Sequence, residues 1–245
     1  VRSSAASDVY KRQILIQVFC VILGGVLYNK CSAKRKKCLR YATICSNAGF
    51  LGNPIAQGVF GMMGLTLASI YLIPQRIMMW SEGVSVFTEA PTKKEMLKKI
   101  FTHPCIIACE IGIVLMLTGW RPPHFLEETI TSVSNCNTAM SMLVIGMILA
   151  DADPKTIIDK DVLFYTFIRL LIIPFCVFIP CWLLHTDSLV MGVSVILAAM
   201  PAGATTTILA SKYDCEEEFS VKLVVFSTAA SLITTPLWNM ILLKF

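Results

Sequence analysis

The stretch that decides the fold runs from Cys45 to Gly58 and reads CSNAGFLGNPIAQG. It lies in an apolar segment long enough to cross a bilayer, yet Gly52, Asn53 and Pro54 follow one another at its centre. Proline removes a backbone donor and clashes with the preceding helical turn, so a helix must bend or break here. Backbone left unpaired at membrane depth is tolerated only where it is buried in protein or lines a polar cavity. The stretch therefore predicts a broken membrane helix with a site at the break.

The composition indicates a membrane protein. Of the 245 residues, 56% are hydrophobic and 15% are charged, and the mean hydropathy is +0.70, which is too apolar for an ordinary globular domain. The net charge of +5 comes mainly from Lys and Arg between apolar blocks, so we interpret it as a topology signal and not as a nucleic-acid surface. The ten Cys are scattered without a CxxC pair, so we expect no metal site, no disulfide framework and no cofactor.

Eight apolar segments are expected to cross the bilayer. The loops over 29–40 and 89–103 are rich in Lys and Arg, so we expect both on the cytoplasmic side. A short turn is expected at Gly64, between the broken segment and the next span. The expected spans are 14–28, 41–63, 65–87, 104–119, 130–150, 164–184, 189–210 and 219–243.

Residues 1–13 are set apart from these spans. They lack an initiator Met and the apolar core of a signal peptide, and they resemble a translated sequencing adapter. We therefore expect this segment to be non-native, leave it out of the fold, and expect the natural protein to begin further upstream.

The order of a span, a broken span and a span occurs twice, around Pro54 and around Pro201. An odd number of spans separates the two broken helices, so the two triplets run in opposite directions, as in inverted-topology repeats. We therefore divide the chain into the remainder of a first repeat with three helices, 14–88, a cytoplasmic basic linker, 89–103, and a second repeat with five helices, 104–245. The two helices that would complete the first repeat are expected to precede this chain.

Three ordered motifs resemble the auxin efflux carrier (PIN-like) family of membrane transporters. They are NAGFLGNP at 47–54, MPAGATTT at 200–207 followed by ASKY at 210–213, and TTPLW at 234–238. The resemblance covers roughly Leu15 to Leu243. It implies an all-α, inverted-repeat (5+5 helix) secondary transporter in which the fourth and ninth helices are broken and cross, with about eight of the ten transmembrane helices present here.

The resemblance also implies a function. Plant members of the family export the auxin anion, and bacterial relatives include malate and other dicarboxylate permeases. We therefore expect a multi-pass protein of the plasma membrane, which in a bacterium is the inner membrane. We expect it to carry a small organic anion such as a carboxylate by alternating access. The resemblance leaves open whether H⁺ or Na⁺ is coupled and whether the chain forms a homodimer.

Other classes of function were weighed against this one. The sequence has no GxSxG, HExxH or GxxxxGK[ST] motif, so we expect no enzyme and no catalytic residue. The alternative is a transporter-shaped ligand-sensing membrane module, which a fused soluble domain would favour.

Partial charges are expected to bind the anion. The exposed N–H groups at the start of a half-helix equal roughly half a positive charge, and two such ends would converge near Pro54 and Pro201 without a Lys or Arg in the site. Glu110 is the candidate for ion coupling, because a carboxylate inside a span is functional by default; a Glu paired across helices is the alternative. Arg169 is expected to snorkel to the inner surface. The substrate-binding candidates are Asn47, Gly52, Asn53, Pro54, Gln57, Asn137, Pro201 and Thr205.

Overall fold

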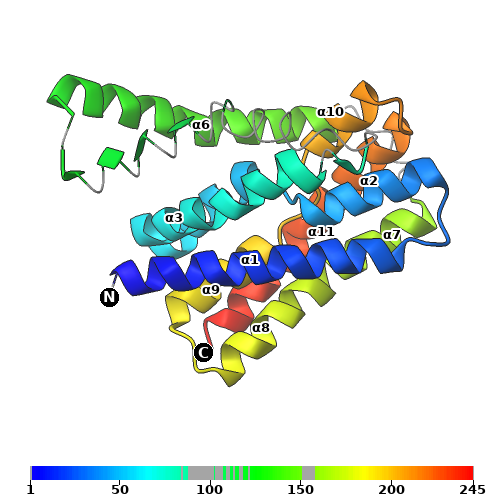
Figure 1. Cartoon of the computed structure of the whole chain (residues 1–245), viewed down its shortest axis with the longest axis horizontal. Coiled ribbons are helices and arrows are strands. Elements are labelled where there is room, and N and C mark those ends of the chain that lie inside the picture. Colours follow the sequence, from blue (N-terminus) through cyan, green and yellow to red (C-terminus); the bar gives the residue numbers. More distant parts are fainter. Residues whose placement is uncertain are drawn as a thin grey trace.

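The computed structural model describes residues 2–83, 85–87, 102, 107–108, 111–112, 114–115, 118–120, 122–150 and 158–244. Long helices make up this part of the chain and lie side by side (Figure 1). Four of its helices are long and apolar enough to cross a membrane: Ser4–Leu27, Ala48–Gly83, Lys160–Leu183 and Glu217–Leu242. The expected all-α membrane architecture is confirmed. Only separate short pieces of the predicted span 104–119 are among the described residues, and of the predicted linker 89–103 only Thr102 is described.

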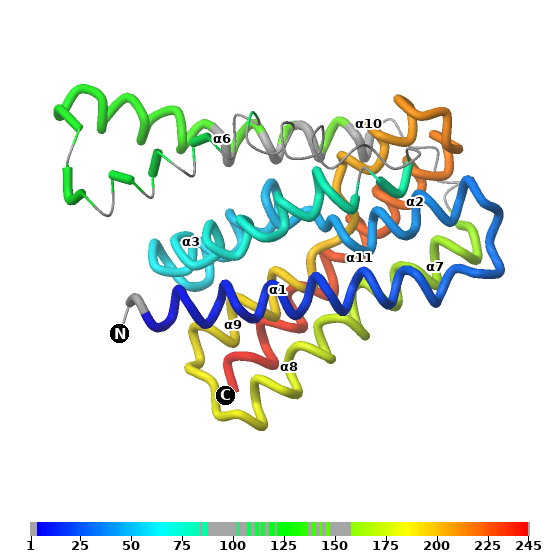
Figure 2. The backbone as a smooth tube through the Cα atoms, in the orientation of Figure 1, coloured from blue at the N-terminus to red at the C-terminus, as the bar shows by residue number. Residues whose placement is uncertain are grey.

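Helix α1 (Arg2–Leu27) leads into the first basic loop, and α2 (Ala33–Ile44) returns beside it (Figure 2). The α1 helix contains residues 2–13, which the sequence analysis leaves out of the fold, and the Val9 side chain among them is fully buried. Ser32 ends the loop, because its hydroxyl accepts a backbone N–H from the first turn of α2 at 3.3 Å. The span that starts the described chain is therefore longer than predicted.

The first break in the membrane backbone lies at residues 45–47, directly after α2. One π-helical turn, η1 (Ala48–Gly52), follows it and continues without interruption into α3 (Asn53–Met78). The predicted break around Pro54 is therefore wrong in its position. Pro54 lies directly after η1, so the helix that begins at Ala48 passes through the proline with a π-helical turn in place of a break. The wider hydrogen bonds of η1 complete the junction.

The chain turns back inside the α3 range (Figure 2), and the residue with a non-helical backbone there is Gly61. The φ angle of Gly61 is 66°, in the left-handed region that glycine enters without steric cost. The turn was predicted at Gly64, which is buried instead. A Cβ atom at Gly64 would lie 2.5 Å from the Ala56 carbonyl oxygen, so this glycine permits close packing of the two limbs. The second limb continues through another π-helical turn, η2 (Met79–Gly83), back towards the first break.

The C-terminal part of the described chain supplies the rest of the bundle. Its elements are α6 (His124–Ala150), α7 (Lys160–Phe167), the π-helical turn η3 (Ile168–Ile172), α8 (Ile173–Leu183), α9 (Ser188–Ala198), α10 (Thr205–Lys212) and α11 (Glu217–Leu242). The core surrounds α9, whose residues from Val190 to Ala198 are all buried. Helices α1, α3, α8 and α11 pack around it.

The α7, η3 and α8 pieces follow one another as a single span that contains Pro174. This proline leaves the Leu170 carbonyl without its α-helical donor, because proline has no N–H. The indole N–H of Trp238 on α11 donates to that carbonyl at 2.9 Å. A side chain from the last helix therefore satisfies a backbone group that the span cannot satisfy itself, as the bilayer requires.

The second break lies at residues 199–204, between α9 and α10. It is confirmed where Met200 and Pro201 predict it. The following helix is short, and a loop then leads to α11, which spans the membrane in one piece.

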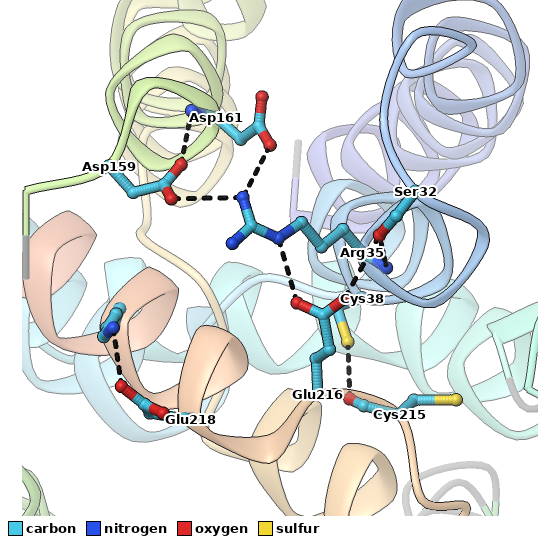
Figure 3. A network of polar contacts seen from close by, with 9 residues as sticks. Ser32, Arg35, Cys38, Asp159, Asp161, Cys215, Glu216 and Glu218 are labelled. Carbon is cyan, nitrogen blue, oxygen red and sulfur yellow. Dashed lines mark hydrogen bonds and ion pairs between the residues drawn. The ribbon is translucent and has the colours of Figure 1, made fainter.

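An ion cluster ties three connections together at the end of the bundle that carries the first basic loop (Figure 3). The Arg35 guanidinium reaches Asp159 at 3.1 Å, directly before α7, and Asp161 at 3.0 Å, in the first turn of α7. It also reaches Glu216 at 2.9 Å, directly before α11. The pKa of Arg35 is raised, mainly by its hydrogen bond to Glu216. Partial burial acts to raise the pKa of Asp159, but the Asp161 N–H and the Arg35 charge lower it below its ordinary value.

We expect the stability that this cluster contributes to disappear on acidification. Because the pKa of Asp159 is lowered in the folded chain, its contribution is fully present above the ordinary Asp pKa of about 3.9 and is lost as the pH falls through the lower folded value. Arg35→Gln should therefore cost about 1 kcal/mol at pH 7, the order expected for a half-exposed network. Its thermal unfolding in detergent should approach that of the wild type below about pH 4.

Lys34→Gln is the matched control, because Lys34 lies on the same turn and makes one exposed pair, with Asp214 at 3.4 Å. Its effect should be close to zero at both pH values. A stability loss in Arg35→Gln that stays the same from pH 7 to acid would contradict the ionic origin.

Candidate functional site

The two breaks lie against each other and pair through their backbones. The Asn47 N–H donates to the Pro201 carbonyl at 2.8 Å, and the Gly203 N–H donates to the Cys45 carbonyl at 3.3 Å. Between these bonds, Ser46 forms an isolated antiparallel bridge with Ala202. The interrupted backbones therefore satisfy each other at membrane depth and run in opposite directions where they meet. We call this pairing the crossing.

Side chains from neighbouring helices satisfy further backbone groups at the crossing. The Tyr165 hydroxyl donates to the Ala42 carbonyl at 3.0 Å, at the end of α2. The Ala202 N–H donates to the Ser227 hydroxyl oxygen at 3.1 Å, on α11. These bonds connect α7 and α11 to the two breaks in this conformation.

Arg169 in η3 is buried beside the crossing, with 3% of its surface exposed. Its Nε donates to the Met200 carbonyl at 2.9 Å, and its Nη1 donates to the Thr43 carbonyl at 3.1 Å. The expectation that Arg169 snorkels to the surface is therefore wrong. The guanidinium remains inside, because it is the donor for carbonyls at the C-terminal ends of both half-helices, α2 and α9.

A small cavity opens on the other side of the crossing. Its volume of about 20 Å³ is enough for one water molecule. Gln75 connects α3 to the first break in the wall of this cavity, because its Nε2 donates to the Ser46 carbonyl at 2.8 Å. The lining residues come from the two breaks and from the second limb of α3: Ser46, Asn47, Gly49, Phe50, Leu72, Gln75, Arg76, Met79, Gly203, Ala204 and Thr205.

Arg76 places a formal positive charge in this cavity. Its guanidinium lies over Gly49, where a Cβ atom would come within 2.7 Å of Nη2. Its Nη1 lies 4.0 Å from the Met79 sulfur. Within the described ranges, no carboxylate lies at ion-pair distance from Arg76. The expectation of a site without Lys or Arg is therefore wrong.

Two helix starts face the same cavity. The chain resumes its helical course at Ala48 after the first break and at Thr205 after the second. The residues at these starts, Asn47 and Thr205, both line the cavity, and Asn47 is 4% exposed. Because helix starts carry partial positive charge, the field of the cavity has the same sign as Arg76.

The structure brings some of the predicted site residues to the crossing. Asn47 and Thr205 line the cavity, and Pro201 takes part in the backbone pairing. Gly52 lies in η1, where a Cβ atom would meet Leu197 Cδ2 at 2.5 Å, so its role here is close packing.

Other predicted residues lie elsewhere. Asn53, Pro54 and Gln57 occupy the first turns of α3 and do not line the cavity. Glu110 and the side chain of Asn137 lie outside the described residues.

Gln75 and Arg76 were missed by sequence reasoning. Arg76 carried a signal, because an ionisable residue inside an apolar span is a functional candidate by default. Gln75 carried none, since only the turn at Gly61 brings it to Ser46.

Comparison with known proteins identifies relatives of the chain. Residues 86–239 match the model of a family described as membrane transport protein. An uncharacterized transporter of Methanocaldococcus jannaschii is 24% identical, over 100% of this chain and 82% of its own length. One of Methanothermobacter thermautotrophicus is 26% identical over 94% and 78%, and the uncharacterized transporter YfdV of Escherichia coli is 21% identical over 78% and 63%.

Proposed function

Because the chain belongs to the membrane transport protein family, whose match confirms the resemblance to the auxin efflux carriers, we propose that it carries a small organic anion at the crossing. It is a multi-pass membrane protein of a transporter family and not of an enzyme family. The substrate class we propose is a carboxylate, and the location we propose is the plasma membrane, the inner membrane if the source is bacterial.

The observation that carries the proposal is the uniform sign of charge around the cavity. Arg76 supplies one formal positive charge, and the helix starts at Ala48 and Thr205 supply about half a charge each. The described lining contains no Asp or Glu to offset them. An anion that reaches this point exchanges its hydration shell for fixed N–H donors and a guanidinium. A carboxylate fits the planar fork of the guanidinium well.

The size of the cavity supports transport by alternating access. Its volume of about 20 Å³ admits one water and no organic acid, so the substrate enters only when the walls move apart. The opposite directions of the two breaks at the crossing support an inverted repeat of five plus five helices. In this proposal one bundle rocks against the other around the crossing.

A paired ligand panel tests the proposal. The purified protein in detergent is heated with phenylacetate against phenylacetamide, and with succinate against succinamide, at equal ionic strength. We expect an acid of the panel, but not its amide, to raise the unfolding temperature, because only the acid carries the charge that the cavity attracts. Equal shifts for acid and amide would overturn the anion assignment.

Flux separates transport from sensing. In proteoliposomes, the acid that binds should exchange with its labelled form across the membrane. Binding without any exchange would favour the ligand-sensing module over the transporter.

A further inference from the structure

Two half-helices end at the guanidinium of Arg169. It holds the Thr43 carbonyl in the last turn of α2 at 3.1 Å and the Met200 carbonyl just after α9 at 2.9 Å. The third neighbour is the Cys20 sulfur at 3.9 Å. No described Asp or Glu pairs with Arg169, so backbone dipoles are the negative charge that faces this buried cation.

Charge balance explains why a cation is stable here. Each helix end carries roughly half a negative charge, so two converging ends offer about one unit, which matches the single charge of Arg169. Isolated burial of a guanidinium is costly, and good hydrogen bonds to both ends offset that cost. Without Arg169, the C-terminal ends of α2 and α9 would create a negative potential beside the cavity, which Arg76 and the two helix starts make positive.

In secondary transporters with broken helices, unwound carbonyls and half-helix C-terminal ends commonly coordinate Na⁺ or H⁺, while the N-terminal ends bind the anionic substrate. In this chain, hydrogen bonds from Arg169 already occupy those carbonyls. We propose that Arg169 is a built-in cation that takes the place of a coupling Na⁺ at the crossing and makes anion binding independent of sodium. This inference rests on the proposed function, because it concerns the charge selectivity of the same site.

The role assigned to Arg169 is that of a specificity-determining and positioning residue. It does not line the cavity and acts on the anion through the potential of the crossing. It also joins the end of α2 to the end of α9, which lie in different broken helices. Its loss should therefore leave an oxygen-lined pocket of negative potential that an alkali cation can fill.

The test compares wild type, Arg169→Met and Arg169→Lys in NaCl and in choline chloride of equal ionic strength, with phenylacetate as the probe. Wild-type affinity should change less than about twofold between the two salts. In Arg169→Met, affinity in choline should fall about tenfold or more, and Na⁺ should restore part of it. Arg169→Lys keeps the charge and should remain insensitive to sodium. Purely structural damage would not respond to the identity of the cation.

A second readout needs no substrate. Na⁺ should raise the unfolding temperature of Arg169→Met relative to choline and leave the wild type unchanged, because only the variant has an empty cation place. If no acid binds the wild type, the proposed function fails, whereas this readout still tests Arg169. The inference would be overturned if sodium changed the binding or stability of the wild type, or if a folded Arg169→Met bound the anion equally well with and without sodium. If Arg169→Met does not fold, the measurements on the wild type decide the question.

Discussion

Arg76→Gln is expected to weaken carboxylate binding about tenfold to a hundredfold. A hydrogen bond to a charged partner contributes about 1.5–3 kcal/mol, and each 1.4 kcal/mol corresponds to a factor of ten in affinity. Gln keeps a polar but shorter side chain, so the variant removes the charge and the guanidinium fork while Gln75 continues to hold the Ser46 carbonyl. The measurement is the Kd of the acid that shifts the unfolding temperature, with initial flux in proteoliposomes as the companion.

Two further variants make this result specific. Lys34→Gln removes the same formal charge from an exposed side chain far from the cavity lining, so its effect on affinity should stay within about twofold. Gly49→Ala leaves the charge in place but puts a Cβ atom where Arg76 Nη2 now lies, 2.7 Å away. It should displace the guanidinium and lower affinity with little loss of stability. Unchanged binding in Arg76→Gln would remove Arg76 from the site.

Gly52→Val is expected to destabilise the bundle by about 2–3 kcal/mol, because overpacking a dense core costs about 1–3 kcal/mol. A Cβ atom at Gly52 would stand 2.5 Å from Leu197 Cδ2 and 3.2 Å from Met200 Cγ. Leu197 is fully buried, so its side chain has no free space to turn into. The added methyl groups would push η1 away from α9 and separate the two broken helices.

A double-mutant cycle isolates this contact. Leu197→Ala alone should cost about 2–5 kcal/mol through the cavity it leaves. Combined with Gly52→Val it should cost at least about 1 kcal/mol less than the sum, because the valine fills that cavity. Gly58→Val is the control, since a Cβ atom there meets no atom within 4 Å. Thermal or denaturant unfolding in detergent measures all four variants, and strictly additive losses would show that Gly52 and Leu197 do not press on each other.

Local chemistry was enough to predict the helical membrane class and the second break. Long apolar segments between charged loops indicate spans whatever the tertiary structure, and Met200-Pro201 interrupts its helix where the sequence predicts. The motifs that resemble the transporter family also led to the right family. These features depend on residues close together in the chain.

The position of the first break depends on distant residues, which is why it was predicted wrongly. Pro54 looks like a breaker, but the helix continues through it from the π-helical turn that precedes it. Residues 45–47 carry no strong local signal, and they leave the helix because their backbone pairs with Pro201 and Gly203. The roles of Arg76 and Arg169 were hidden for the same reason, since each is defined by carbonyls or cavity walls from elsewhere in the chain.

The pairing of the two breaks joins segments that are made at different times during synthesis. Half-helices α2 and α9 have 12 and 11 residues, about 17–18 Å, and neither crosses a hydrocarbon core of about 30 Å alone. The partners in the crossing are separated by about 150 residues, so the first break emerges from the ribosome long before its complement. Until then its carbonyls and N–H groups have no lasting donors or acceptors in lipid. The first break therefore gains these backbone bonds only after the second break has been synthesised, and the Ser227 bond to Ala202 forms only after α11 has followed.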